Sequence, residues 1–389
     1  MLVLKVIFWI SGLMIIYPYV GYIVLLWTIS LFVSKINRES TALVLPKVTL
    51  LISAYNEEFV IKDKILNSLS LDYPKDLIEI VVVSDGSDDG TGSIVEQYED
   101  QGVMLRHFEG RIGKTACLNK AVVLSKGEIV VFSDANSNYD KDAIKNLVRH
   151  FCDQKIGFVT GTTKYVTNSD ENAIESVGLY SRIEKFTKML ESRIGSCVGA
   201  DGAIFAVRKS LYQPLKDYDI NDFVIPLSVV KQNHRGILES SAFCIEKTAS
   251  DIRGEFSRQI RITNRTIRAI FNNASLLNPF CCGFFSLELL SHKVCKFLVP
   301  FFMLIMFFTN MMLISQGSLY VAVFIAQICF YLIAIINHSL HFLPVLSKLA
   351  SASYTFTTVN LAILLGWVQY LKGETYTTWS PGQRGDIIQ

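Results

Sequence analysis

Three stretches of the sequence begin with an apolar run and end in polar or acidic residues: VTLLISAYNEE at 48–58, EIVVVSDGSDDGT at 79–91 and EIVVFSDANS at 128–137. The first six residues of each are dominated by β-branched and other apolar side chains, which is typical of strands buried on both faces. Helical periodicity between them predicts a parallel α/β sheet with right-handed crossovers. The expected helices are 57–69, 88–100 and 114–125.

The chain as a whole is unusually apolar. Of its 389 residues 50% are hydrophobic and only 19% are charged, whereas a soluble domain usually carries about 25% charge. Part of the chain is therefore expected in a membrane. The net charge of +2 excludes a strongly basic nucleic-acid-binding protein. The eight cysteines form no CxxC pair, which favours reduced thiols over a zinc site or a disulfide framework.

Two regions predict membrane helices. Residues 2–33 contain one charge, Lys5, and predict a single helix bent near Pro18. Residues 297–347 contain no Asp, Glu, Lys or Arg and allow two spans. The basic residues after the first helix place the next segment on the cytoplasmic side; these are Lys35, Arg38 and Lys47.

A last uncharged run, 349–371, is interrupted by Ser, Thr and Asn. It either crosses the membrane or lies in the interface. If it crosses, the tail after it ends outside the cell, and if it does not, the tail lies beside the soluble domain.

The polar residues that follow the three strands are expected at one edge of the sheet, where parallel sheets bind ligands. Any one of these motifs is also compatible with a simple turn. Together, acidic residues such as Asp85 and Asp134 at separate strand ends predict a binding crevice.

The order and sequences of these motifs resemble those of the family 2 inverting glycosyltransferases, in particular membrane-bound relatives of the cellulose, hyaluronan and poly-N-acetylglucosamine synthases. The resemblance implies a Rossmann-like GT-A catalytic domain between membrane segments. The implied layout is an N-terminal membrane helix (1–34), a cytoplasmic GT-A domain (48–275), an amphipathic interface helix (276–296), two to three membrane helices (297–371) and a tail with a Trp/Arg segment (372–389).

The resemblance implies a nucleotide pocket. Ala54, Tyr55 and Glu57 match the first loop of the family, which lines this pocket. Asp85 matches the acidic residue that contacts the nucleoside, and Lys114 the Gly-Lys that reaches the nucleotide.

The family's metal motif, Asp-x-Asp, reads Asp134-Ala135-Asn136 in this chain. Asp134 and Asn136 supply the oxygen ligands that Mg²⁺ or Mn²⁺ prefers, with the diphosphate completing the shell. The amide in second place removes one negative charge, so the metal is expected to bind more weakly.

Asp222 matches the base that takes the proton of the acceptor hydroxyl, with a helix cap as the alternative role and Asp219 as its rival. Upstream, the sequence VGADGA at 198–203 resembles the loop that meets the acceptor, although a tight turn also explains it. Its implied acceptor-binding residues are Gly199, Asp201 and Gly202.

The family's Gln-x-x-Arg-Trp motif is altered. Arg258 stands in place of its Gln, Arg261 matches its Arg, and Ile262 replaces its Trp. The two arginines are expected to clamp the diphosphate. Other polar residues of this region are expected at lipid headgroups, namely Arg265, Arg268 and His292, and Trp379 in the tail is expected to cover the nucleotide site.

The sequence thus predicts an inverting, metal-dependent glycosyltransferase of the cytoplasmic face of the cell membrane. Its substrates are a nucleotide sugar, most simply a UDP-sugar, and a cell-surface polysaccharide or lipid-linked glycan. A homo-oligomer or a synthase complex is compatible with this reading. Two alternatives are transfer of one sugar to a lipid-phosphate carrier and a catalytically silent, nucleotide-sugar-binding subunit of a synthase. A transporter is disfavoured because the clear spans contain no ionisable residue.

Overall fold

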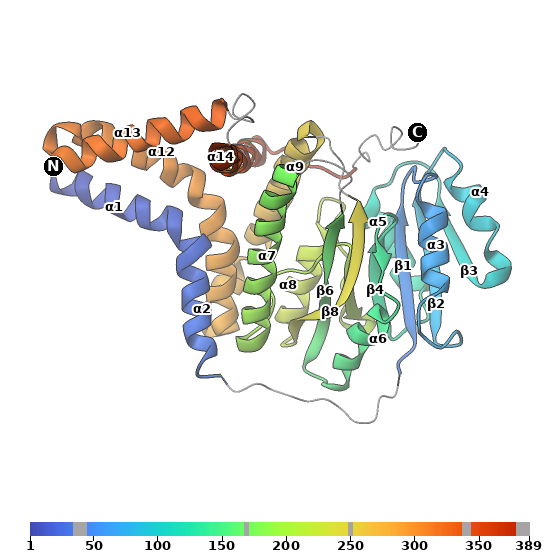
Figure 1. Cartoon of the computed structure of the whole chain (residues 1–389). Coiled ribbons are helices and arrows are strands. Elements are labelled where there is room, and N and C mark those ends of the chain that lie inside the picture. Colours follow the sequence, from blue (N-terminus) through green and yellow to red (C-terminus); the bar gives the residue numbers. More distant parts are fainter. Residues whose placement is uncertain (34–44, 167–170, 248–251, 337–343, 379–389) are drawn as a thin grey trace.

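A mixed sheet forms the centre of the soluble part of the chain (Figure 1). The computed structural model describes residues 1–33, 45–166, 171–247, 252–336 and 344–378. Within these ranges the strand order is β3-β2-β1-β4-β7-β6-β8-β5. The strands are β1 (Val48–Ala54), β2 (Ile78–Asp85), β3 (Val103–Phe108), β4 (Ile129–Asp134), β5 (Asn138–Tyr139), β6 (Ile156–Val166), β7 (Ile204–Arg208) and β8 (Arg235–Lys247).

The parallel half of the sheet confirms the sequence prediction. β1 pairs in parallel with β2 on one side and β4 on the other, and β3 extends the sheet beyond β2. All three predicted strands therefore end at the same edge. The ends carry Ala54, Asp85 and Asp134 as their last residues.

Beyond β4, outside the three predicted strands, the sheet is mixed. β7 runs antiparallel to β4 and β6, β8 is parallel to β6, and β5 is antiparallel to β8. The reason lies in residues 195–203, which run back along the sheet after helix α7 (Glu171–Ile194). Cys197 N–H donates to Gly236 O (3.0 Å) at the start of β8, and Asp201 meets Thr163 near the end of β6. The chain thus enters β7 from the edge at which β4 ends.

Helices cover both faces of this sheet. α3 (Ile61–Leu69) and α6 (Ala143–Val148) pack on the face that carries Leu50 and Ile52, whereas α5 (Lys114–Leu124) and α8 (Asn221–Lys231) pack on the opposite face. Each face is apolar because both are buried. The other helices of this part are α4 (Thr91–Glu96) and α9 (Ile252–Asn272), with short helical turns at Glu99–Gln101, Arg149–Cys152, Lys209–Leu211 and Ala274–Leu277.

The N-terminal apolar run is a bent helix, as predicted. α1 (Leu2–Ile16) and α2 (Tyr22–Ser30) are joined by a π-helical turn, Tyr17–Gly21, that contains Pro18. Proline removes a backbone donor from the helix, and π-turns are a common cause of such bends.

The C-terminal helices begin with α10 (Pro279–Cys282). The run Phe284–Gln316 is continuous and contains α11 (Phe284–Leu289), a π-helical turn (Leu290–Val294) and α12 (Cys295–Leu313). It is followed by α13 (Ser318–Ile335) and α14 (Pro344–Leu371). In the described ranges, four helical segments are long and apolar enough to cross a membrane, beginning at Leu2, Phe284, Ser318 and Leu349.

The predicted interface helix, 276–296, is not one helix. Gly283, with φ +55°, separates α10 from α11, and α11 continues directly into α12. The predicted headgroup contact of His292 is also wrong, because this side chain is buried against α7.

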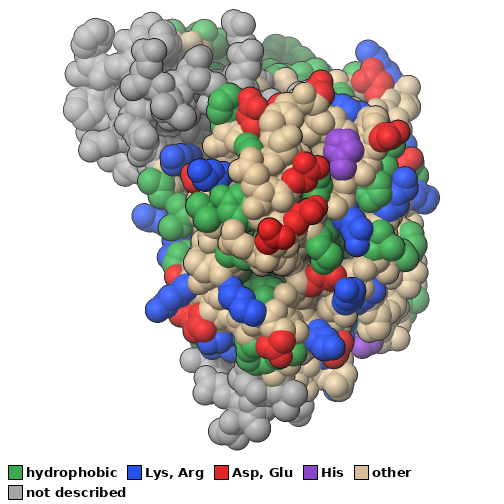
Figure 2. Space-filling model, turned by 90° about the vertical axis from the view of Figure 1, so that its right-hand side faces the viewer, with side chains coloured by type: hydrophobic (Ala, Val, Ile, Leu, Met, Phe, Trp, Pro, Cys, Tyr) green, Lys and Arg blue, Asp and Glu red, His purple; other side chains and the backbone are tan. Residues whose placement is uncertain are grey.

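The apolar helices project from one side of the soluble domain. Figure 1 shows α1, α12 and α13 running away from the sheet, whereas α14 is seen along its axis beside α9. At the tip of this projection Phe8 packs with Leu313 and Tyr320. The opposite side of the molecule, in Figure 2, carries Lys, Arg, Asp and Glu side chains dispersed over its surface. All eight cysteines are free thiols.

Candidate active site

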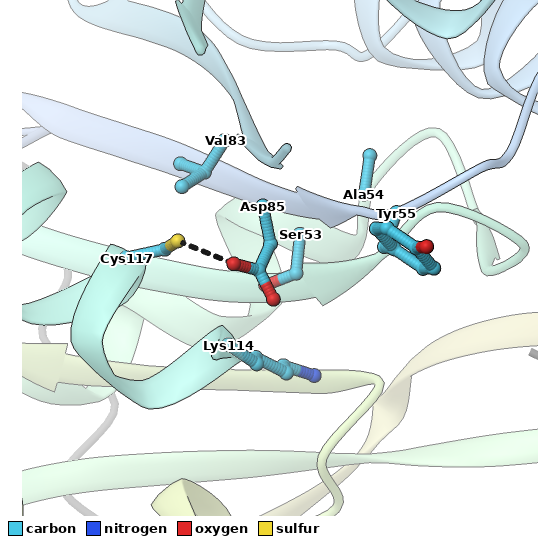
Figure 3. Close-up of a pocket in the computed structure, with 7 residues that line it drawn as sticks. All are labelled: Ser53, Ala54, Tyr55, Val83, Asp85, Lys114 and Cys117. Atoms are coloured by element: carbon cyan, nitrogen blue, oxygen red, sulfur yellow. Dashed lines mark hydrogen bonds between the residues drawn. The ribbon is translucent and has the colours of Figure 1, made fainter. Parts of the chain in front are cut away.

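A small pocket opens at the ends of β1 and β2. It is lined by Ser53, Ala54, Tyr55, Val83, Asp85, Lys114 and Cys117 (Figure 3). Four of the residues predicted to bind the nucleotide therefore share one cavity: Ala54, Tyr55, Asp85 and Lys114.

Asp85 holds the loop that carries Lys114. Its Oδ1 accepts hydrogen bonds from Gly113 N–H (2.9 Å) and from the Cys117 thiol (3.4 Å). Burial, and then the charge of Asp85, raises the pKa of Cys117 above its ordinary value. The thiol is therefore a neutral donor, and Asp85 Oδ2 remains available to a ligand.

The first loop surrounds the mouth of this pocket. The Arg111 guanidinium stacks on the Tyr55 ring, 3.6 Å from its centroid, which gives a flat platform of the kind on which bases stack. Glu57 is buried, and its backbone N–H donates to Thr91 Oγ1 (2.8 Å). That bond joins the end of β1 to the start of α4.

Lys114 links the nucleotide pocket to the metal motif. Its Nζ lies 2.5 Å from Asp134 Oδ1, so the ammonium group of Lys114 faces both the pocket and the end of β4. Asn136 is half-buried two residues further on. Among the residues that the structure describes, no group of three His, Cys, Asp or Glu side chains can hold a metal ion. Asp134 and Asn136 fit a hard cation that takes its remaining ligands from a diphosphate.

Asp222 lies in the first turn of α8. Burial raises the pKa of its carboxyl above the ordinary value, and Lys114 and Lys188 oppose this shift. Its Oδ1 is buried without a hydrogen-bond partner. The rival Asp219 differs, because its Oδ2 accepts from Lys216 N–H (2.9 Å) and shapes its own turn. Asp222 thus presents a buried carboxylate oxygen without a protein partner, whereas Asp219 uses one of its oxygens to hold its own turn.

The glycine-containing loop lies directly against Asp222. Ala200 N–H donates to Asp222 O (2.8 Å). A Cβ at Gly202 would lie 2.8 Å from Asp222 Oδ2, and one at Gly199 would lie 3.6 Å from Asp222 O. Asp201 is committed elsewhere, since its carboxylate accepts from Thr163 N–H and Oγ1 (2.9 Å each).

Four arginines form one stripe along α9, at positions 258, 261, 265 and 268. Arg265 Nε donates to Tyr218 O (2.9 Å) and Arg268 Nη2 to Glu374 O (2.8 Å). These bonds contradict the predicted headgroup role of both residues. Arg258 pairs with Glu255 (2.7 Å) on the same helix, and burial lowers the pKa of Arg261. A diphosphate clamp formed by Arg258 and Arg261 remains a prediction.

The segment after α14 lies on the soluble domain. Asn264 Nδ2 donates to Glu374 O (3.2 Å). A Cβ at Gly113, which has φ +93°, would lie 2.6 Å from Thr377 O. The tail therefore reaches the loop that carries Lys114. Trp379, which is predicted to cover the nucleotide, lies outside the described residues.

Several polar residues around the site were not predicted. Lys188 Nζ on α7 donates to Ala200 O (3.3 Å). Glu246 on β8 accepts from Ser137 Oγ, and burial and then Asp134 raise its pKa to about 7. Lys64 Nζ is buried beneath the same loop and donates to Ser137 O. No local motif marks these residues, although a charged residue inside a strand or a helix's apolar face is a usable signal.

The soluble domain matches a known protein family. Residues 49–215 match the profile of the family described as Glycosyl transferase family 2. The chain therefore contains a glycosyltransferase family 2 domain with the GT-A fold, as the sequence motifs suggested.

Curated relatives share parts of this domain. The chain is 29% identical over 185 residues to "Probable glycosyltransferase YdaM" of Bacillus subtilis, which covers 45% of this chain and 43% of that protein. It is 33% identical over 132 residues to the beta-monoglucosyldiacylglycerol synthase of Trichormus variabilis, covering 33% and 28%. It is 25% identical over 220 residues to the poly-beta-1,6-N-acetyl-D-glucosamine synthase of Staphylococcus aureus, covering 55% and 53%. These matches span about half of each relative or less.

One solved structure resembles nearly the whole chain. The mannosyltransferase PcManGT from Pyrobaculum calidifontis, determined in complex with GDP-Man and Mn²⁺, superposes with a TM-score of 0.74. The likeness covers 95% of this chain and 99% of that one at 21% sequence identity. It shows that the arrangement of the soluble domain and the apolar helices occurs in a known fold.

Proposed function

We propose that this protein transfers a sugar from a nucleotide sugar, most simply a UDP-sugar, to a cell-surface polysaccharide or a lipid-linked glycan, with inversion. The observation that carries the proposal is the position of Lys114 between the pocket and the end of β4. Lys114 lines the pocket with Asp85 and pairs with Asp134. Its charge also opposes the rise that burial causes in the pKa of Asp222.

This geometry suits a single displacement. Asp222 takes the proton of the acceptor hydroxyl as the oxygen attacks the anomeric carbon, and the bond to the nucleoside diphosphate breaks. Attack from the face opposite the leaving group inverts the anomeric centre. Lys114 stabilises the charge of the departing diphosphate. A divalent cation on Asp134 and Asn136 would add Lewis-acid stabilisation of the same charge.

The acceptor is the less defined substrate. Relatives include one synthase of a polysaccharide and one of a glycolipid. Ile262, in place of the family's Trp, removes an aromatic surface on which a sugar ring stacks. This substitution favours a short or lipid-linked product over a long polymer.

The position of the tail supports a particular topology. α12 ends and α13 begins at the tip where the N-terminal helix also lies. α13 returns to the soluble domain, where Phe330 packs against Phe356 of α14 (6.0 Å between centroids). α14 packs on α9 through Gly366, next to Thr263, and the tail contacts Gly113 on the same side. We therefore infer three crossings, with α14 in the interface and both the tail and the catalytic domain in the cytoplasm.

Substrate identity is tested with purified protein in liposomes of a native lipid extract. A panel of labelled UDP- and GDP-sugars is supplied with Mg²⁺ or Mn²⁺, and products are separated into lipid-linked and polymeric fractions. We expect one UDP-sugar to label a product, and EDTA to stop the labelling. Labelling by no donor would contradict an active transferase and favour the silent-subunit alternative.

The topology is tested by cysteine labelling in sealed cells. The background lacks the exposed thiols Cys152, Cys281 and Cys329. Gln316→Cys at the tip is expected to react with a membrane-impermeant maleimide, whereas Thr378→Cys is expected to react only after permeabilisation. Reaction of Thr378→Cys in intact cells would show that α14 crosses the membrane.

A further inference from the structure

Glu191 of α7 is a fully buried carboxylate that joins three separate segments. Its Oε1 accepts hydrogen bonds from Tyr22 Oη of α2 (2.8 Å) and pairs with His292 Nδ1 in the π-turn (2.7 Å). Its Oε2 accepts from Val198 N–H (3.2 Å). Glu191 and Tyr22 are 0% exposed and His292 is 5% exposed.

Tyr22 and His292 both lie in segments that lead into the membrane helices. Figure 1 shows α2 and the start of α12 side by side against α7. Apolar contacts between Tyr22, Leu26 and Leu190 fill the same junction. Burying a carboxylate costs several kcal/mol unless it is paired and fully hydrogen-bonded. The three partners meet this requirement only when both membrane segments are in place.

The third partner, Val198, begins the loop that meets Asp222. A second buried glutamate from the membrane side, Glu288 of α11, accepts from Ser196 N–H (3.2 Å). Two residues after Val198, Ala200 N–H donates to Asp222 O (2.8 Å). The start of the loop is therefore held by Glu288 of a membrane segment and by Glu191 of α7, which itself bonds to both membrane segments. The middle of the loop is held by the residue expected to act as base.

Charged groups also meet at the other face of this junction. Glu184 lies about two turns before Glu191 on α7, and His292 Nε2 contacts it (3.2 Å). Lys188, Lys293 and Lys296 approach the same carboxylate at 3.9–4.0 Å. These contacts bind α7 to the start of α12. Among the described charged residues of α7, Glu191 is the one that accepts a hydrogen bond from a backbone N–H of the loop.

We propose that Glu191 is a positioning residue that fixes the acceptor loop, residues 196–202, relative to the membrane helices. An acceptor embedded in the membrane enters at a height set by those helices, and Glu191 places Asp222 at that height. The inference rests on the proposed function. Loss of the contact therefore lowers transfer to a membrane acceptor but leaves the nucleotide pocket, formed by other strands, unchanged.

The test compares one reaction of the purified protein in native-lipid liposomes with a second reaction of the same protein in detergent. One is transfer from the UDP-sugar that gives the fastest labelling, and the other is slow hydrolysis of that donor in detergent without acceptor. The variants are Glu191→Gln and Tyr22→Phe, which removes one oxygen. Thr28→Val is the matched control, because its hydroxyl donates only within α2, to Val24 O (2.8 Å).

We expect Glu191→Gln to lower transfer about tenfold and Tyr22→Phe about threefold, the sizes expected for weakened bonds to a charged group. Donor hydrolysis and donor KM are expected to stay within twofold of wild type, and Thr28→Val to match wild type in both reactions. Equal loss of transfer and hydrolysis would indicate a purely structural role, and unchanged transfer in both variants would exclude coupling. Either result overturns the proposal. Absence of transfer by wild-type protein would instead contradict the proposed function itself.

Discussion

The proposed donor half and the proposed acceptor half of the site are built in different ways. The donor half consists of side chains at the ends of β1, β2 and β4, with Lys114 at the start of α5. The acceptor half consists of the loop 196–202 and Asp222. It is held by α7 and by residues of the membrane segments, including Tyr22 and Glu288.

This difference separates two requirements of the reaction. A nucleotide sugar arrives from solution, so its pocket needs only the rigid edge of a sheet. A membrane acceptor arrives along the bilayer, so its loop needs a fixed relation to the helices that define the bilayer. Substitutions in the two halves are therefore expected to change different kinetic parameters.

The largest effect is expected for Asp222→Asn, at the centre of the acceptor half. The amide keeps the shape but cannot take the acceptor proton, so transfer is expected to fall by about 10² to 10⁴-fold. Donor binding, measured by calorimetry, should be unchanged because the pocket is formed by other residues. Asp219→Asn is the control, and a comparable loss there would exchange the roles of the two residues.

Asp134→Asn tests the donor half. It removes the only carboxylate of the Asp-x-Asn motif, and transfer is expected to fall by roughly 100-fold, because metal stabilisation of developing charge is worth several kcal/mol. The Mn²⁺ concentration needed for half-maximal activity should rise. Asn136→Asp restores the second carboxylate of the family motif and is expected to lower that concentration. If metal dependence is the same in all three proteins, the cation does not bind here.

Two substitutions of Asp85 distinguish its contact with the loop from the effect of its charge on donor binding. Asp85→Ala removes the acceptor for Gly113 N–H, and the donor KM is expected to rise by roughly 10-fold or more. Asp85→Asn keeps an oxygen for this bond, so a smaller rise is expected. Steady-state kinetics with saturating acceptor gives both values. Equal effects of the two changes would mean that the carboxylate's charge, and not the loop contact, determines affinity.

The smallest effect concerns the pH profile. Burial raises the pKa of Asp222, while Lys114 and Lys188 lower it. A base must be deprotonated, so activity rises as the pH increases through this pKa. Lys188→Met removes one opposing charge and is expected to move the acid limb of kcat/KM to higher pH by up to about 1 unit. Lys185→Met, exposed on the same helix, should leave the limb in place.

Local patterns predicted the donor half well. The runs at 48–53, 79–84 and 128–133 specify buried parallel strands, and the polar residues that follow each strand must then meet at one edge. Ala54, Tyr55 and Asp85 were therefore expected together from short-range information, whereas Lys114 was added by the resemblance to the family. The same patterns predicted the bend at Pro18 and the long apolar helices.

Long-range contacts decided the rest. The antiparallel direction of β7 depends on the path of residues 195–203. The sequence alone predicts an interfacial position for His292, whereas in the structure α7 buries it beside Glu191 and Glu184. Arg265 similarly meets backbone carbonyls near Asp219 and not lipid.

The sequence by itself determined the three parallel strands at 48–53, 79–84 and 128–133, the apolar helices and the polar motifs at the strand ends, because strand and helix periodicity and loop chemistry are properties of neighbouring residues. Only the tertiary structure decided which buried charges pair, where the tail lies and how the acceptor loop is held. The physical reason is that a buried charge is stable only beside its partners, and for Glu191 those partners lie 169 and 101 residues away along the chain.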